Sequence, residues 1–222
     1  MPKAVIFDLD GTLWDTVAPL TLIWNQVFQK NNTGKVISED DLRNVMGKNL
    51  QEISAIYFPD MERSRREDIL NQCAVAHCAY LKEHGAPLFL DRATLSQLYA
   101  KYDLFIVSNC PCGYIEAFLE SCDLQKYFKD FEMSGRTGKT KGENINAICE
   151  RNGLRVGATA NLVPNAVYVG DTLGDESAAN FSGIPFIHAA YGFGTANNPA
   201  AVLHNFSELP EVLENLNGPI LF

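Results

Sequence analysis

The chain of 222 residues lacks long apolar runs and basic tracts. No stretch approaches the roughly 18 apolar residues that span a membrane, and the apolar run before Asp8 is too short for a signal peptide. The longest basic stretch, Arg63-Ser64-Arg65-Arg66, is flanked by acidic residues on both sides. The formal net charge of −9 predicts a surface that repels nucleic acid and anionic lipid. We therefore expect a cytoplasmic protein without nucleic-acid or membrane partners.

Cysteines are present, but their spacing follows no disulfide, redox or zinc pattern. The six cysteines are irregularly spaced, and most lie in apolar contexts, where cysteine acts as a small hydrophobic residue. The closest pair, Cys110-Pro111-Cys112, is not a Cys-x-x-Cys redox motif and lacks the second pair that a zinc site needs. Reduced thiols are therefore expected, as in the cytosol.

The periodicity of apolar residues divides the chain into two parts. From about residue 15 to residue 85 the spacing is helical, with helices expected around 20–28, 42–46, 50–57 and 65–83 and no strand among them. From Asp91 onwards helices and strands alternate, which is typical of a parallel sheet. We predict an α/β protein with a doubly wound, Rossmann-like parallel-sheet core of residues 1–14 and 86–222. An all-helical domain of residues 15–85 is inserted into this core.

Polar residues stand where the expected strands of this core end. The strands are expected at 4–7, 103–108, 131–133, 166–169 and 185–188, and residues 155–165 are expected to form a loop. Because the carboxyl ends of parallel strands meet in one crevice, polar residues at these ends and at the helix start near 143 should gather there. They are Asp8 and Asp10, Ser108 and Asn109, Lys139 and Lys141, and Asp171 and Asp175.

The balance of charge in such a crevice favours phosphate chemistry with a divalent cation. If Asp10 is protonated as a general acid, then Asp8, Asp171 and a phosphoryl dianion carry a formal charge of about −4. Mg²⁺ prefers oxygen ligands and offsets two of these charges, a lysine offsets a third, and helix N-termini offset part of the rest. Without the cation and the lysine, the dianion would meet uncompensated repulsion. The lysine is either Lys139 or Lys141.

Four motifs in this order resemble those of the haloacid dehalogenase superfamily of phosphohydrolases. They are Asp8-Leu9-Asp10-Gly11-Thr12, Ser108-Asn109, the lysine at 139 or 141, and Gly170-Asp171-Thr172-x-x-Asp175. The helical insertion is similar to the α-helical cap (C1 type) of phosphoglycolate phosphatase-like members. The resemblance covers nearly the whole chain, and its first and fourth motifs are the most specific.

The resemblance implies a Mg²⁺-dependent phosphomonoester hydrolase that acts on a small phosphorylated metabolite as a monomer or dimer. Asp8 would be the nucleophile that forms an aspartyl-phosphate, and Asp10 would be the general acid and base. The metal would be held by Asp8, the backbone carbonyl of Asp10 and Asp171. Asp175 would support the waters on the metal.

The resemblance implies further roles in binding and orientation. Ser108 and the backbone of Asn109 would bind phosphoryl oxygens, and Thr12 would help to orient Asp10. The lysine motif departs from the commoner pattern, in which a proline follows the lysine. We favour Lys141, because it lies closer to the start of the expected helix, and keep Lys139 as the alternative.

A loop within the helical insertion is a candidate for contact with the substrate. Gly47-Lys48-Asn49 interrupts helical sequence and resembles the substrate-specificity loop of the family. Lys48 is the candidate contact, and a solvated lysine behind a helix-terminating glycine is an equal alternative.

Two other functions share part of this chemistry. A sugar phosphomutase of the same superfamily uses the same aspartyl-phosphate step. A phosphoacceptor domain resembling response-regulator receivers also combines clustered aspartates, Mg²⁺, a hydroxyl residue and a lysine on a parallel sheet. The long helical insertion and the acid/base position of Asp10 weigh against the receiver.

Overall fold

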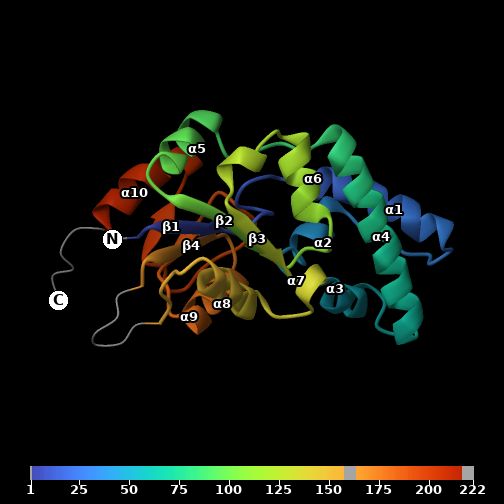
Figure 1. Ribbon diagram of the computed structural model, residues 1–222. Coiled ribbons are helices and arrows are strands. Elements are labelled where there is room, and N and C mark those ends of the chain that lie inside the picture. Colours follow the sequence, from blue (N-terminus) through green and yellow to red (C-terminus); the bar gives the residue numbers. More distant parts are fainter. Residues whose placement is uncertain (1, 158–163, 217–222) are drawn as a thin grey trace.

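The computed structural model describes residues 2–157 and 164–216, and its centre is a parallel sheet of six strands in the order β3-β2-β1-β4-β5-β6 (Figure 1). The strands are β1 (Ala4–Phe7), β2 (Asp103–Ser108), β3 (Asp130–Met133), β4 (Ala166–Gly170), β5 (Phe186–Ala189) and β6 (Ala201–Leu203). Every neighbouring pair is parallel. The order of winding reverses between β1 and β4, which is where ligands bind in doubly wound sheets. The predicted α/β fold class is confirmed.

Helices cover both faces of the sheet, as alternation of side chains along each strand requires. Helices α5 (Arg92–Tyr99), α6 (Tyr114–Ser121) and α10 (Leu209–Asn215) lie on one face, and α8 (Lys141–Arg151) and α9 (Leu173–Ser182) lie on the other (Figure 1). Val5 and Phe7 of β1 belong to the core cluster of the first face. Ala4 and Ile6 belong to the cluster of the second face. The central strands are therefore buried on both sides, and their sequences are almost entirely apolar.

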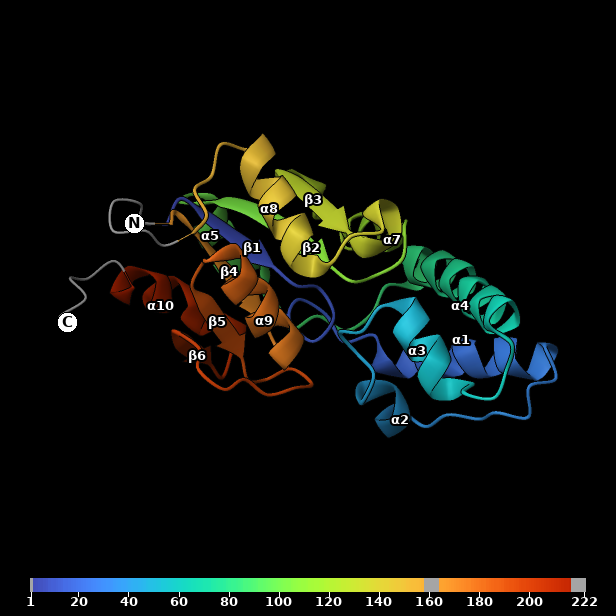
Figure 2. The same cartoon turned by 90° about the horizontal axis from the view of Figure 1, so that it is seen from below.

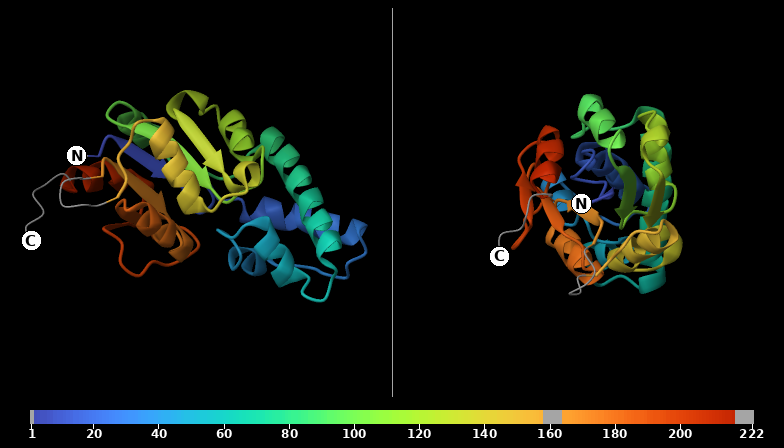
Figure 3. Two further views of the ribbon diagram at one scale, coloured as in Figure 1. Left: turned by 60° about the horizontal axis from the view of Figure 1, so that its bottom comes forward. Right: turned by 60° about the vertical axis from the view of Figure 1, so that its left-hand side comes forward.

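Four helices between β1 and α5 form a cap beyond the carboxyl end of the sheet (Figure 2). They are α1 (Val17–Lys30), α2 (Glu39–Arg43), α3 (Leu50–Tyr57) and α4 (Arg63–His84). Aromatic side chains fill the interior of the cap, with Phe28 packed edge-on against Tyr57 and Phe58. Helix α4 contacts α1 and α3 of the cap and α6 of the core. The left-hand view of Figure 3 shows the cap helices as a separate group beyond this end of the sheet.

The predicted elements differ from the structure at a few places that matter for function. Helix α8 begins at Lys141 rather than at Glu143, because Thr140 and Glu143 form a reciprocal capping box. On α4, expected around 65–83, the buried face includes His77, whereas Ala76 and Tyr80 are only partly buried. Strand β6 and the one-turn helix α7 (Ser134–Thr137) were not predicted, because three or four residues carry too little periodicity.

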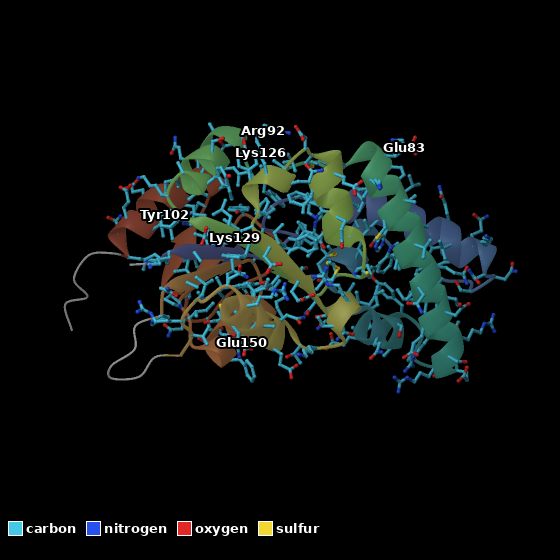
Figure 4. All side chains as sticks on the ribbon, in the orientation of Figure 1. Glu83, Arg92, Tyr102, Lys126, Lys129 and Glu150 are labelled. Atoms are coloured by element: carbon cyan, nitrogen blue, oxygen red, sulfur yellow. The ribbon has the colours of Figure 1, made fainter. Side chains whose placement is uncertain are left out.

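Many charged side chains lie on the outer surface. Glu83 on α4 and Glu150 on α8 point outward, away from the junction between cap and sheet (Figure 4). In the described parts of the chain, no helix is both long and apolar enough to cross a membrane. Of the predicted loop 155–165, residues 158–163 lie outside the described residues.

Candidate active site

Three aspartates meet at the carboxyl ends of the two central strands. Asp8 follows β1 and Asp171 follows β4, and the backbone N–H of Asp8 donates to the carbonyl of Val169 at 2.8 Å. Asp175 lies in the first turn of α9, directly behind Asp171. Asp8, Asp171 and Asp175 each offer a carboxylate oxygen, and these oxygens all lie within 4.8 Å of one another. All three side chains are buried, so their charges need a compensating partner.

Gly11 of the first motif leaves the space that the carboxylate of Asp171 occupies. Gly11 has a φ of +79°, and a Cβ atom there would lie 2.2 Å from Oδ2 of Asp171. The same oxygen accepts a hydrogen bond of 2.7 Å from the backbone N–H of Phe193. Any larger residue at position 11 would therefore combine a strained backbone with a clash against the carboxylate.

Lys141 supplies the positive charge of this cluster. Its Nζ lies 3.0 Å from Oδ1 of Asp8 and 2.6 Å from Oδ1 of Asp175. Burial opposes the charge of Lys141, but the carboxylates of Asp175 and Asp8 outweigh it and raise its pKa. The alternative, Lys139, is exposed and lines a neighbouring groove. The start of α8 at residue 141 is what directs this lysine to the site.

A single lysine leaves the carboxylates incompletely neutralised. Burial, followed by the charge of Asp175, raises the pKa of Asp8 to about 7. Burial, Asp175 and Asp8 hold the pKa of Asp171 well above its usual range. Oδ1 of Asp171 is buried and has no hydrogen-bond partner among the described residues. Buried carboxylate oxygens that converge and lack a partner fit a hard cation such as Mg²⁺.

Asp10 stands beside this cluster, but its carboxylate has different partners. Oδ1 of Asp10 accepts hydrogen bonds from the hydroxyls of Thr16 at 2.7 Å and Tyr114 at 2.8 Å. Burial raises the pKa of Asp10 to about 6, against the effect of these two donors. A carboxyl group that titrates near neutrality can exist in both protonation states during one reaction.

The orientation of Asp10 corrects one expectation from the sequence. Thr12 was expected to orient Asp10, but its hydroxyl is buried and has no hydrogen-bond partner among the described residues. The backbone turn after β1, in which the N–H groups of Thr12 and Leu13 donate to the carbonyl of Leu9, brings Thr16 to Asp10 instead. Thr16 occupies the position before α1 and yet makes no side-chain cap, because its hydroxyl serves Asp10.

The residues at the end of β2 connect the core to the cap. Ser108 is buried and lines one pocket together with Asp8 and Asp10. The side chain of Asn109 accepts a hydrogen bond from Ser134 and donates one of 2.8 Å to the carbonyl of Gly47. The cap loop thus lies against the core at the position where phosphate was predicted to bind.

The pocket between core and cap is small, with a volume of about 40 Å³. Asp8 and Asp10 line its core side, and its cap side is lined mainly by apolar residues of α1, α3 and the loop before α3. Lys48 contributes to the lining and is otherwise exposed. Two polar residues that the sequence did not single out for the site, Tyr114 and His77, also line it. Neither carries a local motif, because each reaches the pocket only through the packing of its helix.

Comparison with known proteins agrees with this geometry. Residues 5–189 match the family described as haloacid dehalogenase-like hydrolase. A phosphoglycolate phosphatase of Vibrio parahaemolyticus is 27% identical over 231 residues, which cover 95% of this chain and 96% of that protein. A phosphoglycolate phosphatase of Rhodospirillum rubrum is 27% identical over 214 residues, which cover 91% of this chain and 85% of that protein.

Solved structures show the same fold. A haloacid dehalogenase-like hydrolase of Streptococcus pneumoniae superimposes with a TM-score of 0.79 at 20% identity, covering 96% of this chain and 98% of that one. A protein of Haemophilus somnus described as a predicted phosphoglycolate phosphatase gives 0.80 at 20% identity, with the same coverage. The resemblance read from the four motifs is thereby confirmed. With its family match over most of its length, the chain belongs to the haloacid dehalogenase-like hydrolases.

Proposed function

We propose that this haloacid dehalogenase-like phosphatase hydrolyses short phosphate monoesters through an aspartyl-phosphate on Asp8. The observation that carries the proposal is the buried cluster of Asp8, Asp171 and Asp175 around Lys141, with Asp10 beside it. The family match supports a hydrolase rather than a receiver-like phosphoacceptor. The names of the relatives support phosphoglycolate as the first substrate to test.

The reaction has two displacements at phosphorus. In the first, a carboxylate oxygen of Asp8 forms a bond to phosphorus while the bond to the ester oxygen breaks, and Asp10 gives its proton to that oxygen. In the second, a water attacks phosphorus and gives a proton to Asp10, and the bond from phosphorus to Asp8 breaks. The enzyme returns to its starting protonation state, and inorganic phosphate and an alcohol leave.

The other residues bind and orient. Lys141 lies beside Asp8, where its charge would meet the phosphoryl oxygens as well as the nucleophile. Ser108 and the backbone of Asn109 would donate to phosphoryl oxygens. Mg²⁺, when bound by Asp8, Asp171 and the carbonyl of Asp10 and with Asp175 behind them, would offset the charge of the carboxylates and of the phosphate.

The cap would close the site against water. We propose residues 15–85 as the cap and residues 1–14 with 86–222 as the catalytic core, because all four cap helices fall within the inserted segment. The hydrogen bond from the side chain of Asn109 to the carbonyl of Gly47 connects the cap loop to the core. A closed cap excludes competing water and surrounds the leaving group.

The experiment compares Asp8→Asn with Asp60→Asn, a change at an exposed aspartate of the cap. Release of phosphate from p-nitrophenyl phosphate and from phosphoglycolate is measured with Mg²⁺ and with a chelator. We expect Asp8→Asn to lower kcat by about 10⁴-fold or more, because the nucleophile is lost. Asp60→Asn should keep full activity.

Three results would contradict the proposal. Turnover by Asp8→Asn near that of the unaltered protein would exclude Asp8 as the nucleophile. One stable phosphorylation without phosphate release would indicate a phosphoacceptor, and conversion of a sugar phosphate to its isomer would indicate a mutase.

A further inference from the structure

His77 is a buried polar residue of the pocket that no step described above uses. It lies on α4 of the cap, is 1% exposed, and lines the same pocket as Asp8 and Asp10. Its Nε2 is buried and has no hydrogen-bond partner among the described residues. An unpaired polar group of this kind costs free energy, so its position calls for a partner that the protein itself does not supply.

The neighbours of His77 determine which hydrogen-bonding role Nε2 plays. The indole Nε1–H of Trp24 donates to Nδ1 of His77 at 3.0 Å, and an indole nitrogen can only donate. Nδ1 is therefore the acceptor, and in the neutral ring Nε2 carries the hydrogen. Burial lowers the pKa of His77 to about 3, so the ring is neutral at the pH of ordinary assays. Nε2 is thus a neutral donor.

The other polar groups of the cap side indicate the partner of this donor. The cap side of the pocket is otherwise lined by apolar residues such as Leu20 and Ile53, and its other side-chain donor is the ammonium of Lys48. Neither His77 in this tautomer nor Lys48 can accept a hydrogen bond. A carboxylate accepts hydrogen bonds and donates none, so it satisfies both groups. The hydrogen of a hydroxyl would find no free nitrogen or oxygen acceptor among the side chains there, and the carbonyl of Gly47 already accepts from Asn109.

We propose that His77 is a specificity-determining residue whose Nε2–H donates to a carboxylate oxygen on the leaving group of the substrate. The inference rests on the proposed phosphatase activity and adds the residue that recognises the leaving group of the ester. Trp24 is the positioning residue, because its indole holds His77 in the donor tautomer.

Two substrates distinguish recognition of the carboxylate from the steric fit of the leaving group in the pocket. Phosphoglycolate carries a carboxylate, and isobutyl phosphate carries an apolar group of similar shape at the same place. For the unaltered protein, kcat/KM should favour phosphoglycolate by at least about tenfold, because a buried donor is left unpaired by the apolar ester. This comparison requires no variant.

Two variants test the hydrogen-bonding roles of the two ring nitrogens of His77 separately. His77→Asn places an amide oxygen near the position of Nδ1, where Trp24 can still donate, and leaves no group at the position of Nε2. His77→Gln places an amide nitrogen near the position of Nε2. We expect His77→Asn to reduce the preference for phosphoglycolate by about tenfold, and His77→Gln to reduce it by less than about threefold. The preference is the ratio of kcat/KM for phosphoglycolate to kcat/KM for isobutyl phosphate in the same variant, so a general loss of activity cancels from it.

The outcomes distinguish this inference from the proposed function. If both esters are hydrolysed with equal kcat/KM, or if His77→Asn keeps the preference for phosphoglycolate, His77 does not recognise the leaving group. If both variants lose the preference equally, its role is structural and the inference is overturned. If the unaltered protein hydrolyses neither ester nor p-nitrophenyl phosphate, the proposed function fails instead.

Discussion

The core side and the cap side of the pocket differ in how they use charge. On the core side, Asp8, Asp171, Asp175 and Lys141 are all buried. The three carboxylates each offer an oxygen within 4.8 Å of the others, and Lys141 pairs with Asp8 and Asp175. On the cap side, the buried polar residue is His77, which burial keeps neutral. One side of the pocket is therefore a dense charge cluster, and the other is mostly apolar with a single neutral donor.

This difference has a physical reason. A buried charge on the cap would shift the pKa values of Asp8 and Asp10, because charges interact strongly at low dielectric. A neutral donor discriminates between leaving groups without disturbing those carboxylates. Lys48 is compatible with this division because it is exposed, where solvent screens its charge. We infer that the core carries the reaction and that the cap selects its substrate.

Among the tests of this comparison, the largest expected effect concerns the charge of the core side. Lys141→Met should lower kcat/KM by about 10²- to 10³-fold, because the carboxylates lose the cation beside Asp8. Lys139→Met is the matched control and should change kcat/KM by less than about twofold, since Lys139 is exposed. Phosphate release from p-nitrophenyl phosphate measures both. A greater loss in Lys139→Met would exchange the roles of the two lysines.

The next effect tests the neutrality of the cap side. The pKa of His77 is about 3 in the folded protein, against 6.5 in the absence of burial. Between these values the unfolded chain binds more protons, so stability falls as the pH falls. Lowering the pH from about 7 to about 5 should cost about 2 kcal/mol through His77, and this loss should be absent in His77→Gln.

Urea unfolding at the two pH values measures this change in stability. His204→Gln is the control, because His204 is exposed and does not line the pocket. An identical pH-dependent loss in His77→Gln and in the unaltered protein would show that His77 is not held neutral by burial.

The smallest expected effect concerns Tyr114, which contacts both sides. Its hydroxyl donates to Asp10, and its ring meets the ring of His77 edge-on at 5.0 Å. Tyr114→Phe removes a donor that lowers the pKa of Asp10, so that pKa should rise from about 6. Because Asp10 must be protonated to act as an acid, the alkaline limb of kcat/KM should move upward by up to about one pH unit.

A pH profile of kcat/KM measures this shift, and Tyr99→Phe, a change at an exposed tyrosine, is the control. A limb that stays in place or moves to lower pH would contradict the role of Tyr114. Thr16 remains as a donor to Asp10 in this variant, so activity should be retained.

Much of the core side could be predicted because it depends on short patterns. A buried strand followed by a carboxylate defines a position at the carboxyl edge of the sheet, and Asp8 and Asp171 both satisfy this pattern. The preference for Lys141 rested on its distance from a helix start. The capping box of Thr140 and Glu143 moved that start to Lys141 itself.

The cap side could not be predicted in the same way. The helical spacing over residues 65–83 predicts a helix, but in the structure the buried face of α4 includes His77 and leaves Ala76 and Tyr80 only partly buried. This orientation follows from the packing of α4 against α1, α3 and α6 together, whereas periodicity describes only one face at a time. The family resemblance likewise assigned the orientation of Asp10 to Thr12, whereas in the structure Thr16 donates the hydrogen bond to Asp10.

The sequence by itself determined the α/β core, the helical insertion and the set of carboxylates at the strand ends. These follow from periodicity and chain order, which are local properties. Only the tertiary structure decided that Tyr114 holds Asp10, 104 residues away, and that Trp24 fixes the tautomer of His77, 53 residues away. Such contacts depend on how whole helices pack, because the sequence around a residue does not indicate which distant side chain it will meet across a pocket.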